Sequence, residues 1–360
     1  MKMMRKLLII LVLIIFVFLL CNISFAAENR LTANSGNQTD PKIYEDRVVW
    51  QDNRYGNWDI FMKDVSTNVE TRLTTNSADQ INPDINGDRV VWEDYRYSIY
   101  HPNIFMKDLS TNVETRLSAN PHAQQAPAIY GDIVVWTDYR CGTAEIFMMN
   151  LTTNIETRLT NNFSTDREPN IFGDHIVWND GRYGNAEVFM YDIGSNTEIR
   201  LTTNTGTQRV PSIFGDRVVW QDNRYVNWDI FMKDLTTNAE IRLTTNSAEQ
   251  YQPDIYGDKV FWMDNRYGNW DIYMLNLYTN TENRLTTNSA NQWFPKVYGD
   301  RVVWQDNRYA HWDIFMKDLT TNLESRLTTN PSNQTYASVY SNRVVWQDNR
   351  NGNLDVYILI

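Results

Sequence analysis

Short apolar runs alternate with short polar clusters along most of the chain. In the unit that begins at Pro211, the apolar runs are PSIF, RVVWQ, WDIFMKDL and IRLTT, and polar clusters such as Gly-Asp and Thr-Thr-Asn separate them. The runs are rich in β-branched and aromatic residues, they lack helical spacing, and they are too short for helices. The pattern therefore predicts four strands in this unit, over residues 211–214, 217–221, 228–235 and 241–245.

This unit recurs along the chain. A Val-Val-Trp-like triplet ends at intervals of 42 residues, with one interval of 44, at Trp50, Trp92, Trp136, Trp178, Trp220, Trp262, Trp304 and Trp346. The second strand is apolar at consecutive positions, as in Val218 and Val219, so we expect both of its faces to be buried between neighbouring sheets. Four strands per unit and a period near 42 are typical of a β-propeller.

We therefore predict an all-β fold, an eight-bladed propeller that forms a single domain over residues 27–360. The blades are expected at about residues 41–74, 83–118, 127–160, 169–202, 211–244, 253–286, 295–328 and 337–360. The last unit supplies only three strands, so we expect Arg30–Thr32 to add the fourth beside Val356–Ile358. Such pairing closes the ring and removes an exposed sheet edge.

The first 26 residues have the features of a secretory signal peptide. Lys2, Arg5 and Lys6 precede an apolar run over residues 7–20, and small residues in Ser24-Phe25-Ala26 fit a cleavage site after Ala26. The run is shorter than the roughly 20 residues of a membrane-spanning helix. We expect a secreted, cell-surface or periplasmic protein without a membrane span after cleavage; retention of the segment as an N-terminal anchor is the alternative.

Charge and cysteine content narrow the range of partners. The formal net charge of the chain is −11, and it becomes about −14 once the three cations of the leader are removed. An acidic chain does not attract nucleic acid, whose phosphates need a basic surface, and it does not attract anionic lipid. Cys141 alone remains after cleavage, so no intrachain disulfide is expected. We expect a monomer.

The repeat itself resembles a known family. The segment PDIYGDKVFWMDNRYGNWDIYMLNLYTNTENRLT is similar to the TolB-type, WD40-like propeller repeat, with its Pro-led strand, Gly-Asp turn and terminal Arg-Leu-Thr. The resemblance extends over the whole chain after residue 26 and implies an exported or cell-surface propeller. The same family includes oligogalacturonate lyases and propellers attached to peptidases, so the fold alone does not define the function.

The hairpin QDNRYGNWDIF contains residues that recur in every unit. An Asp two residues after the Trp and an Arg two residues further on occur in all eight units, and an acid begins the third strand in seven of them. Because a ligand site is usually confined to a few blades, we interpret the recurring set as a structural joint, represented by Asp52, Arg54, Asp59, Asp222, Arg224 and Asp229. Binding of a cation is the alternative, but the Arg within the loop and the absence of a calcium-loop spacing disfavour it. We expect no metal and no cofactor.

Other aromatic residues of this hairpin vary between blades. Trp precedes the third strand in four units, whereas Pro102, Ala144, Ala186 and Leu354 replace it in the others. Variable aromatic side chains on a loop face are candidates for contact with a protein or a glycan. The candidates are Trp58, Trp228, Trp270, Trp312, Trp293, Tyr55, Tyr225, Tyr267 and Tyr309; in the alternative, these rings only cover the hairpin.

Motifs for catalysis are missing from the sequence. No nucleophile elbow, His-Glu-x-x-His pair or phosphate loop occurs, and the four histidines do not form a metal-binding triad by position. We therefore expect a non-catalytic module that binds an unidentified partner at the cell surface and acts in protein interaction or as a scaffold. The second hypothesis is a glycan-binding module, and the third, less favoured, is a carbohydrate-active enzyme.

Overall fold

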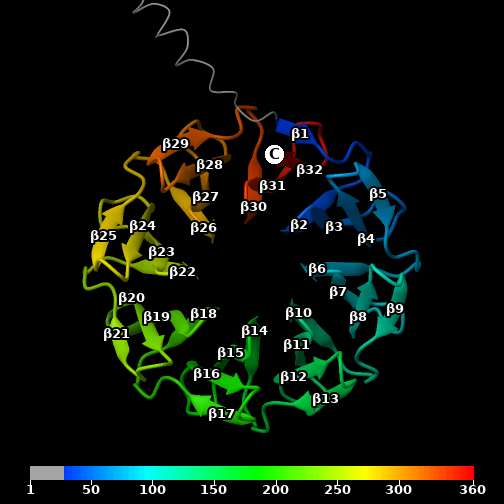
Figure 1. Cartoon of the computed structure of the whole chain (residues 1–360), viewed down its shortest axis with the longest axis horizontal. Helices are drawn as coiled ribbons and strands as arrows, with labels where there is room; N and C mark the ends of the chain where they lie inside the picture. Colours follow the sequence, from blue (N-terminus) through cyan, green and yellow to red (C-terminus); the bar gives the residue numbers. More distant parts are fainter. Residues whose placement is uncertain (1–27) are drawn as a thin grey trace, which may run out of the picture.

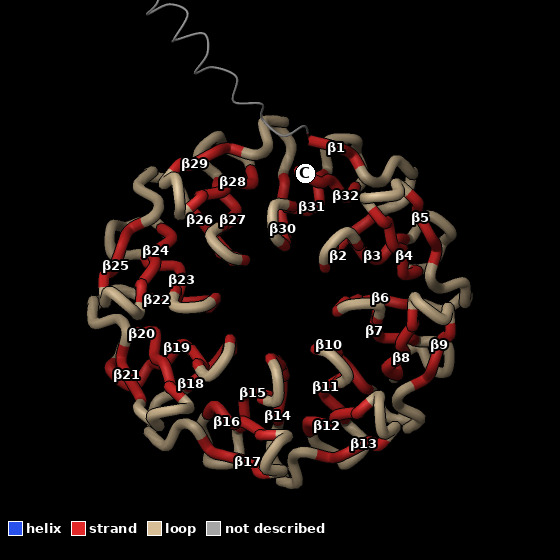
Figure 2. The backbone as a smooth tube through the Cα atoms, viewed as in Figure 1, coloured by secondary structure: helices blue, strands red, loops and turns tan. Residues whose placement is uncertain are grey.

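The computed structural model describes residues 28–360, and these form eight antiparallel sheets of four strands arranged in a ring (Figure 1). The predicted eight-bladed, all-β propeller is confirmed. In blades 1 to 7 the chain runs from the strand nearest the centre outward to the rim (Figure 2). The predicted signal peptide, residues 1–26, lies outside the described residues.

The first four blades each use four consecutive strands. Blade 1 consists of β2 (Gln38–Tyr44), β3 (Arg47–Asp52), β4 (Asp59–Asp64) and β5 (Val69–Arg72). Blade 2 consists of β6 (Gln80–Asn86), β7 (Arg89–Asp94), β8 (Asn103–Asp108) and β9 (Val113–Arg116). Blade 3 consists of β10 (Gln124–Tyr130), β11 (Ile133–Asp138), β12 (Glu145–Asn150) and β13 (Ile155–Arg158). Blade 4 consists of β14 (Asp166–Phe172), β15 (His175–Asp180), β16 (Glu187–Asp192) and β17 (Thr197–Arg200).

Blades 5 to 7 follow the same order, and blade 8 joins the two ends of the described chain. Blade 5 consists of β18 (Gln208–Phe214), β19 (Arg217–Tyr225), β20 (Asn227–Asp234) and β21 (Glu240–Arg242). Blade 6 consists of β22 (Gln250–Tyr256), β23 (Lys259–Asp264), β24 (Asp271–Asn276) and β25 (Thr281–Arg284). Blade 7 consists of β26 (Gln292–Tyr298), β27 (Arg301–Asp306), β28 (Asp313–Asp318) and β29 (Leu323–Arg326). Blade 8 consists of β30 (Gln334–Tyr340), β31 (Arg343–Asp348), β32 (Asp355–Leu359) and β1 (Glu28–Arg30).

The innermost strand is longer than the sequence predicted. In blade 5 it begins at Gln208, three residues before Pro211, and Arg209 pairs with Gln221 before the register shifts. The shift is a β-bulge in which Val210 has a φ of 55°. Proline cannot donate to a ladder, so a strand that passes through one needs such an irregularity. The bulge accommodates Pro211 and lets the strand continue towards the loop face.

The outermost strand ends earlier than predicted. In blade 5 it covers Glu240–Arg242 instead of 241–245. Beyond it, the hydroxyl of Thr244 accepts a hydrogen bond from the N–H of Ile230 at 2.8 Å, and Leu243 packs against the apolar cluster between blades 5 and 6. After Arg242 the chain therefore leaves the ladder: the side chain of Leu243 packs in the core, and the hydroxyl of Thr244 bonds to the backbone of the third strand.

The ring is closed by the N-terminal strand, as predicted, with a different extent. Glu28 pairs with Leu359 and Arg30 with Tyr357, so β1 begins two residues before the predicted Arg30–Thr32 segment. Thr32 acts as Thr244 does and accepts a hydrogen bond from the N–H of Val356 at 2.9 Å. The last blade is thus completed from the other end of the chain.

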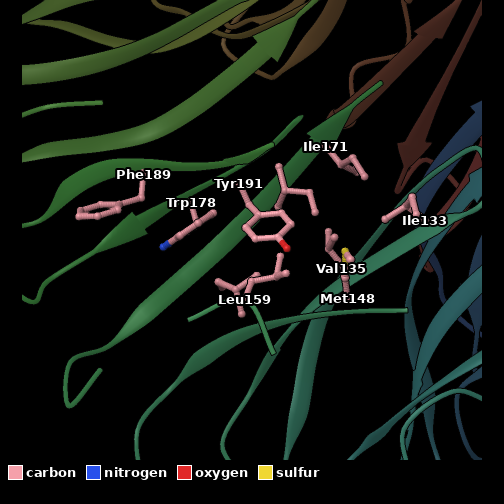
Figure 3. Packing of buried hydrophobic residues seen from close by; sticks show 10 residues of the cluster. Ile133, Val135, Met148, Leu159, Ile171, Trp178, Phe189 and Tyr191 are labelled. Atoms are coloured by element: carbon pink, nitrogen blue, oxygen red, sulfur yellow. The ribbon is translucent and has the colours of Figure 1, made fainter. Parts of the chain in front are cut away.

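The apolar core lies between neighbouring blades. The eight repeated tryptophans of the second strands are fully buried, and Val218 and Val219 join the clusters on opposite sides of blade 5. Figure 3 shows one such cluster, in which Val135 and Met148 of blade 3 meet Trp178 and Tyr191 of blade 4. The predicted burial of both faces is confirmed. Full burial of one such valine stabilises the fold by about 1.5–3 kcal/mol.

Candidate binding face

The repeated Asp and Arg of the hairpin are bonded to each other. Asp52 is fully buried, and its carboxylate accepts hydrogen bonds from the backbone N–H and the Nε of Arg54, each at 2.9 Å. The indole Nε1 of Trp50 donates to the same carboxylate at 3.2 Å. Asp222 has the same donors in Arg224 and Trp220. One carboxylate thus ties the buried tryptophan to the turn that follows it.

The guanidinium extends this joint to the rim. Arg54 pairs with Glu70 of the outermost strand at 2.7 Å and lies 4.1 Å above the ring of Phe61. In every blade the arginine contacts the buried Asp, an acid of the rim strand and an aromatic ring. The rim acids are Glu28, Glu70, Glu114, Glu156, Glu198, Glu240, Glu282 and Glu324. The acids of the rim strand were not singled out from the sequence; their signal is a spacing of 16 residues from the arginine in six blades and of 18 residues in blade 2.

The acid at the start of the third strand forms a second bridge. Asp59 is fully buried and pairs with Arg72 of the outermost strand at 2.7 Å, and Asp229 pairs with Arg242 in the same way. Burial raises the pKa of Asp59, although the bond from Arg72 acts in the opposite direction. In blade 2, Asn103 replaces the acid and still accepts from Arg116 at 2.7 Å. These oxygens are therefore engaged by arginine.

Cation binding has little support in this geometry. Among residues 28–360, no three His, Cys, Asp or Glu side chains come together in a group that could hold a metal ion. The two carboxylates of the hairpin, Asp52 and Asp59, face guanidinium groups instead of open space. The arrangement is suited to holding strands together.

The candidate tyrosines belong to the outer side of the hairpin. The ring of Tyr55 stacks against Phe61 at 6.3 Å, and the guanidinium of Arg72 covers it at 4.2 Å. Arginines cover the equivalent tyrosines in six blades, which include Tyr225, Tyr267 and Tyr309. The rings remain largely exposed at their edges. The structure places the tyrosines beside the rim strand, away from the tryptophans.

The candidate tryptophans lie where one blade passes to the next. The ring of Trp228 is 5.8 Å from Tyr251, which is 5.4 Å from Trp270, and Trp293 is 4.6 Å from Trp312. Trp270 and Trp293 pack on the same apolar cluster between blades 6 and 7. We call these five residues, Trp228, Tyr251, Trp270, Trp293 and Trp312, the aromatic arc. All five are partly buried.

The four tryptophans of the arc were predicted from the sequence, and Tyr251 was not. Its signal was available, because Tyr251 follows the repeated Gln250 as Trp293 follows Gln292. Trp58 was a candidate as well, but it lies in blade 1 and is not brought to the arc. The glutamines are fully buried, and the Nε2 of Gln250 donates to the carbonyl of Ala248 at 2.7 Å. They support the loop below the rings.

The family model described as "TolB beta propeller domain" matches residues 84–255. This part of the ring is therefore similar to the TolB-type propeller. The resemblance predicted from the sequence is confirmed there, and the TolB-type match covers blades 2 to 5 and part of blade 6. No curated protein matches the sequence of the chain.

Solved structures with a similar fold include propellers that belong to peptidases. A structure from a study of two prolyl endopeptidases has a TM-score of 0.65 at 10% identity and covers 90% of this chain and 55% of its own. Dipeptidyl peptidase 4 of Porphyromonas gingivalis has a TM-score of 0.64 at 10% identity, with coverage of 89% and 56%. The propeller of the Trilobed protease of Pyrococcus furiosus has a TM-score of 0.59 at 13% identity, with coverage of 82% and 98%.

These similarities concern the propeller fold alone. The chain spans about half the length of the peptidase structures that it matches. At 10% identity the likeness carries no catalytic residue across. Between residues 28 and 360, no helix is long and apolar enough to cross a membrane.

Proposed function

We propose that this chain is an exported, non-catalytic propeller that binds a protein partner at the cell surface through its loop face. The observation that carries the proposal is the aromatic arc, in which Trp228, Tyr251 and Trp270 form a continuous run across two blades. Large aromatic side chains grouped on one surface are typical of the centres of protein interfaces. The adjoining rings are tilted by 45° and 46°, so they form an uneven surface suited to interdigitating side chains.

Two further observations support the proposal. The Asp-Arg-Glu joint repeats in all eight blades and occupies most of the charged groups of the hairpins, which leaves the variable aromatic positions as the feature that distinguishes one side of the ring. The apolar leader with its preceding cations supports export. The peptidase structures show that this fold occurs as one part of larger proteins. We propose a binding role for it here.

A glycan ligand is the second candidate, and a different feature favours it. A cavity of about 190 Å³ lies between the innermost strands of blades 7, 8 and 1, and its lining includes Phe294, Tyr336, Lys42 and Lys296. Both aromatic rings are exposed, at 45% and 63%. Exposed rings beside groups that form hydrogen bonds can stack on a sugar and fix its hydroxyl groups.

Binding of the labelled protein to intact cells of the producing organism tests the proposal and separates the two candidates. Cells are treated beforehand with a protease, with periodate, or with buffer alone. We expect saturable binding that protease treatment removes and periodate leaves intact. Loss after periodate alone would favour the glycan, and no saturable binding to untreated cells would contradict both candidates.

A further inference from the structure

A cavity of about 290 Å³ lies at the loop face between blades 4 and 5. Its lining includes Arg167 and Glu168 of β14, Asn179 of β15, Gly181 and Ala186 of the hairpin after β15, and Arg209 of β18. This volume is at the lower end of the range of small-molecule sites. It lies beside the aromatic arc but contains none of its residues.

The cavity exists because blade 4 departs from the repeat. Ala186 stands where four other blades have a tryptophan, and Gly181 stands where blade 5 has Asn223. Asn179 is one methylene shorter than the equivalent Gln221, whose carbonyl accepts from the N–H of Gln252 at 3.0 Å. The Oδ1 of Asn179 is buried without a partner. The shorter side chains of Asn179 and Ala186 leave this space, whereas a Cβ at Gly181 would meet the Oγ of Ser164 at 2.7 Å.

Two arginines beside this space have no partner. Among residues 28–360, every arginine other than Arg167 and Arg209 makes a hydrogen bond or an ion pair. The two occupy the same position of the repeat on adjacent blades, directly after Asp166 and Gln208. Both line the cavity. In an acidic chain, two unpaired guanidinium groups at one cavity provide a local site for an anion.

An acid completes the polar lining. The Oε2 of Glu168 accepts a hydrogen bond from the Nδ2 of Asn179 at 2.8 Å, which fixes the carboxylate at the edge of the cavity. Glu168 is itself a residue of the β-bulge of blade 4 and has a φ of 58°. Asp180 also lines the cavity, but its carboxylate accepts a hydrogen bond from the Nε of Arg182 at 2.8 Å. A ligand that meets two unpaired cations and the carboxylate of Glu168 needs an anionic group and a hydrogen-bond donor.

We propose that this cavity binds a small carboxylate that carries an adjacent donor, either an ammonium or a hydroxyl group. The carboxylate accepts hydrogen bonds from Arg167 and Arg209, and the donor faces Glu168. The proposal does not depend on the partner of the aromatic arc, because the two sites share no residue.

L-serine and L-glycerate are matched probes, since they have the same configuration and differ only in an ammonium or a hydroxyl group beside the carboxylate. Inorganic phosphate is the probe that offers an anion without the adjacent carbon-bound donor. The measurement follows the Nε–Hε signals of Arg167 and Arg209 by nuclear magnetic resonance during titration of the whole protein. We expect saturable shifts of both signals, with a dissociation constant on the order of 1 mM, whereas the signal of the engaged Arg182 stays unchanged.

Two kinds of variant test the assignment. R167Q/R209Q removes both cations, and A186W restores the tryptophan that four other blades carry at this position; each should weaken binding by about tenfold or more, since one charge-assisted hydrogen bond accounts for that factor. K107Q/K317Q is the control, with the same change in charge on blades 2 and 7, and it should bind as the parent does. Melting curves establish that each variant is folded.

Several outcomes would overturn the proposal. If none of the three probes shifts the signals of Arg167 and Arg209 at about 10 mM, the cavity does not bind such an anion. Equal affinity for phosphate, serine and glycerate would refute the role of Glu168. Undiminished binding in folded A186W would place the ligand elsewhere.

Discussion

Arg350 of the last blade forms an ion pair with Glu28, which lies 322 positions earlier in the sequence. In six of the other blades the equivalent acid lies 16 residues after the arginine, as Glu70 follows Arg54, and in blade 2 Glu114 lies 18 residues after Arg96. The contact is therefore the same joint, assembled from the two ends of the described chain. Ring closure and the internal architecture of a blade use one set of interactions.

Removal of the closing strand should destabilise the ring. Deletion of residues 28–34 removes the β1 ladder, the Arg30–Asp355 pair and the buried side chain of Leu31, and it exposes the edge of β32. We expect the free energy of unfolding to fall by about 3 kcal/mol or more, or the protein to oligomerise through the free edge. Calorimetry and light scattering measure both, and a chain that begins at residue 27 is the control. An unchanged monomer with unchanged melting would contradict closure by β1.

Loss of the joint carboxylate should cost more than loss of its exposed partner. Asp222→Ala leaves the partly buried Arg224 and the indole of Trp220 without their acceptor, so we expect a loss of about 3 kcal/mol in chemical unfolding. Glu240→Gln removes the outer contact of the same arginine, and about 1 kcal/mol or less is expected there. Equal effects of the two substitutions would show that the buried carboxylate is not the centre of the joint.

Blade 4 contains a buried acid that makes stability depend on pH. Asp166 replaces the repeated glutamine, and burial together with the neighbouring Asp180 raises its pKa to about 7. Between about pH 4 and pH 7 the folded protein therefore binds more protons at this site than the unfolded chain, and stability falls as the pH rises through this window. Asp166→Gln should remove this dependence.

The substitution is expected to raise the free energy of unfolding at pH 8 by about 1–3 kcal/mol and to have a smaller effect at pH 4. Melting temperatures of the parent and the variant across this range provide the measurement. Gln250→Leu in blade 6 is a control for disturbance of the same position without a titrating group. A shift of equal size at both pH values would argue against titration of Asp166.

Chelation of calcium should leave the melting temperature unchanged. The oxygens that crowd the hairpin accept hydrogen bonds from arginine and from threonine, as Asp59 does from Arg72 and Thr74. Melting in the presence of a chelator, and again with added calcium, tests this expectation. A fall of several degrees on chelation would mean that the hairpins hold cations, and the interpretation of the joint would be wrong.

The repeat made the fold readable from the sequence, because each unit shows the same buried Val-Val-Trp triplet and the same turns. The split blade could be predicted from an unpaired Arg-Leu-Thr segment. Strand limits were less accurate, since the bulge at Val210 and the hydroxyl of Thr244 act through hydrogen bonds that composition does not reveal. These local bonds decide where a ladder begins and ends.

The candidate site was predictable in part. Variation between blades singled out Trp228, Trp270 and Trp312, but Tyr251, which lies between two of the tryptophans, becomes visible only when strands of neighbouring blades are in place. The cavity of blade 4 depends on the short side chains of Asn179 and Ala186. A short side chain in one repeat does not by itself predict a cavity, because neighbouring residues can fill the space.

The central claim is that uniform residues build the ring and variable aromatic residues bind the partner. Affinity for the protease-sensitive surface of intact cells tests it most directly, measured for W228A/W270A/W312A and for W58A. Trp58 has the same position in its hairpin but lies outside the arc. We predict that the triple variant, with its fold intact by circular dichroism, loses binding by at least about a hundredfold, since hot-spot residues contribute 2 kcal/mol or more each, and that W58A binds as the parent does. Equal loss in W58A, or undiminished binding by the triple variant, would contradict the claim.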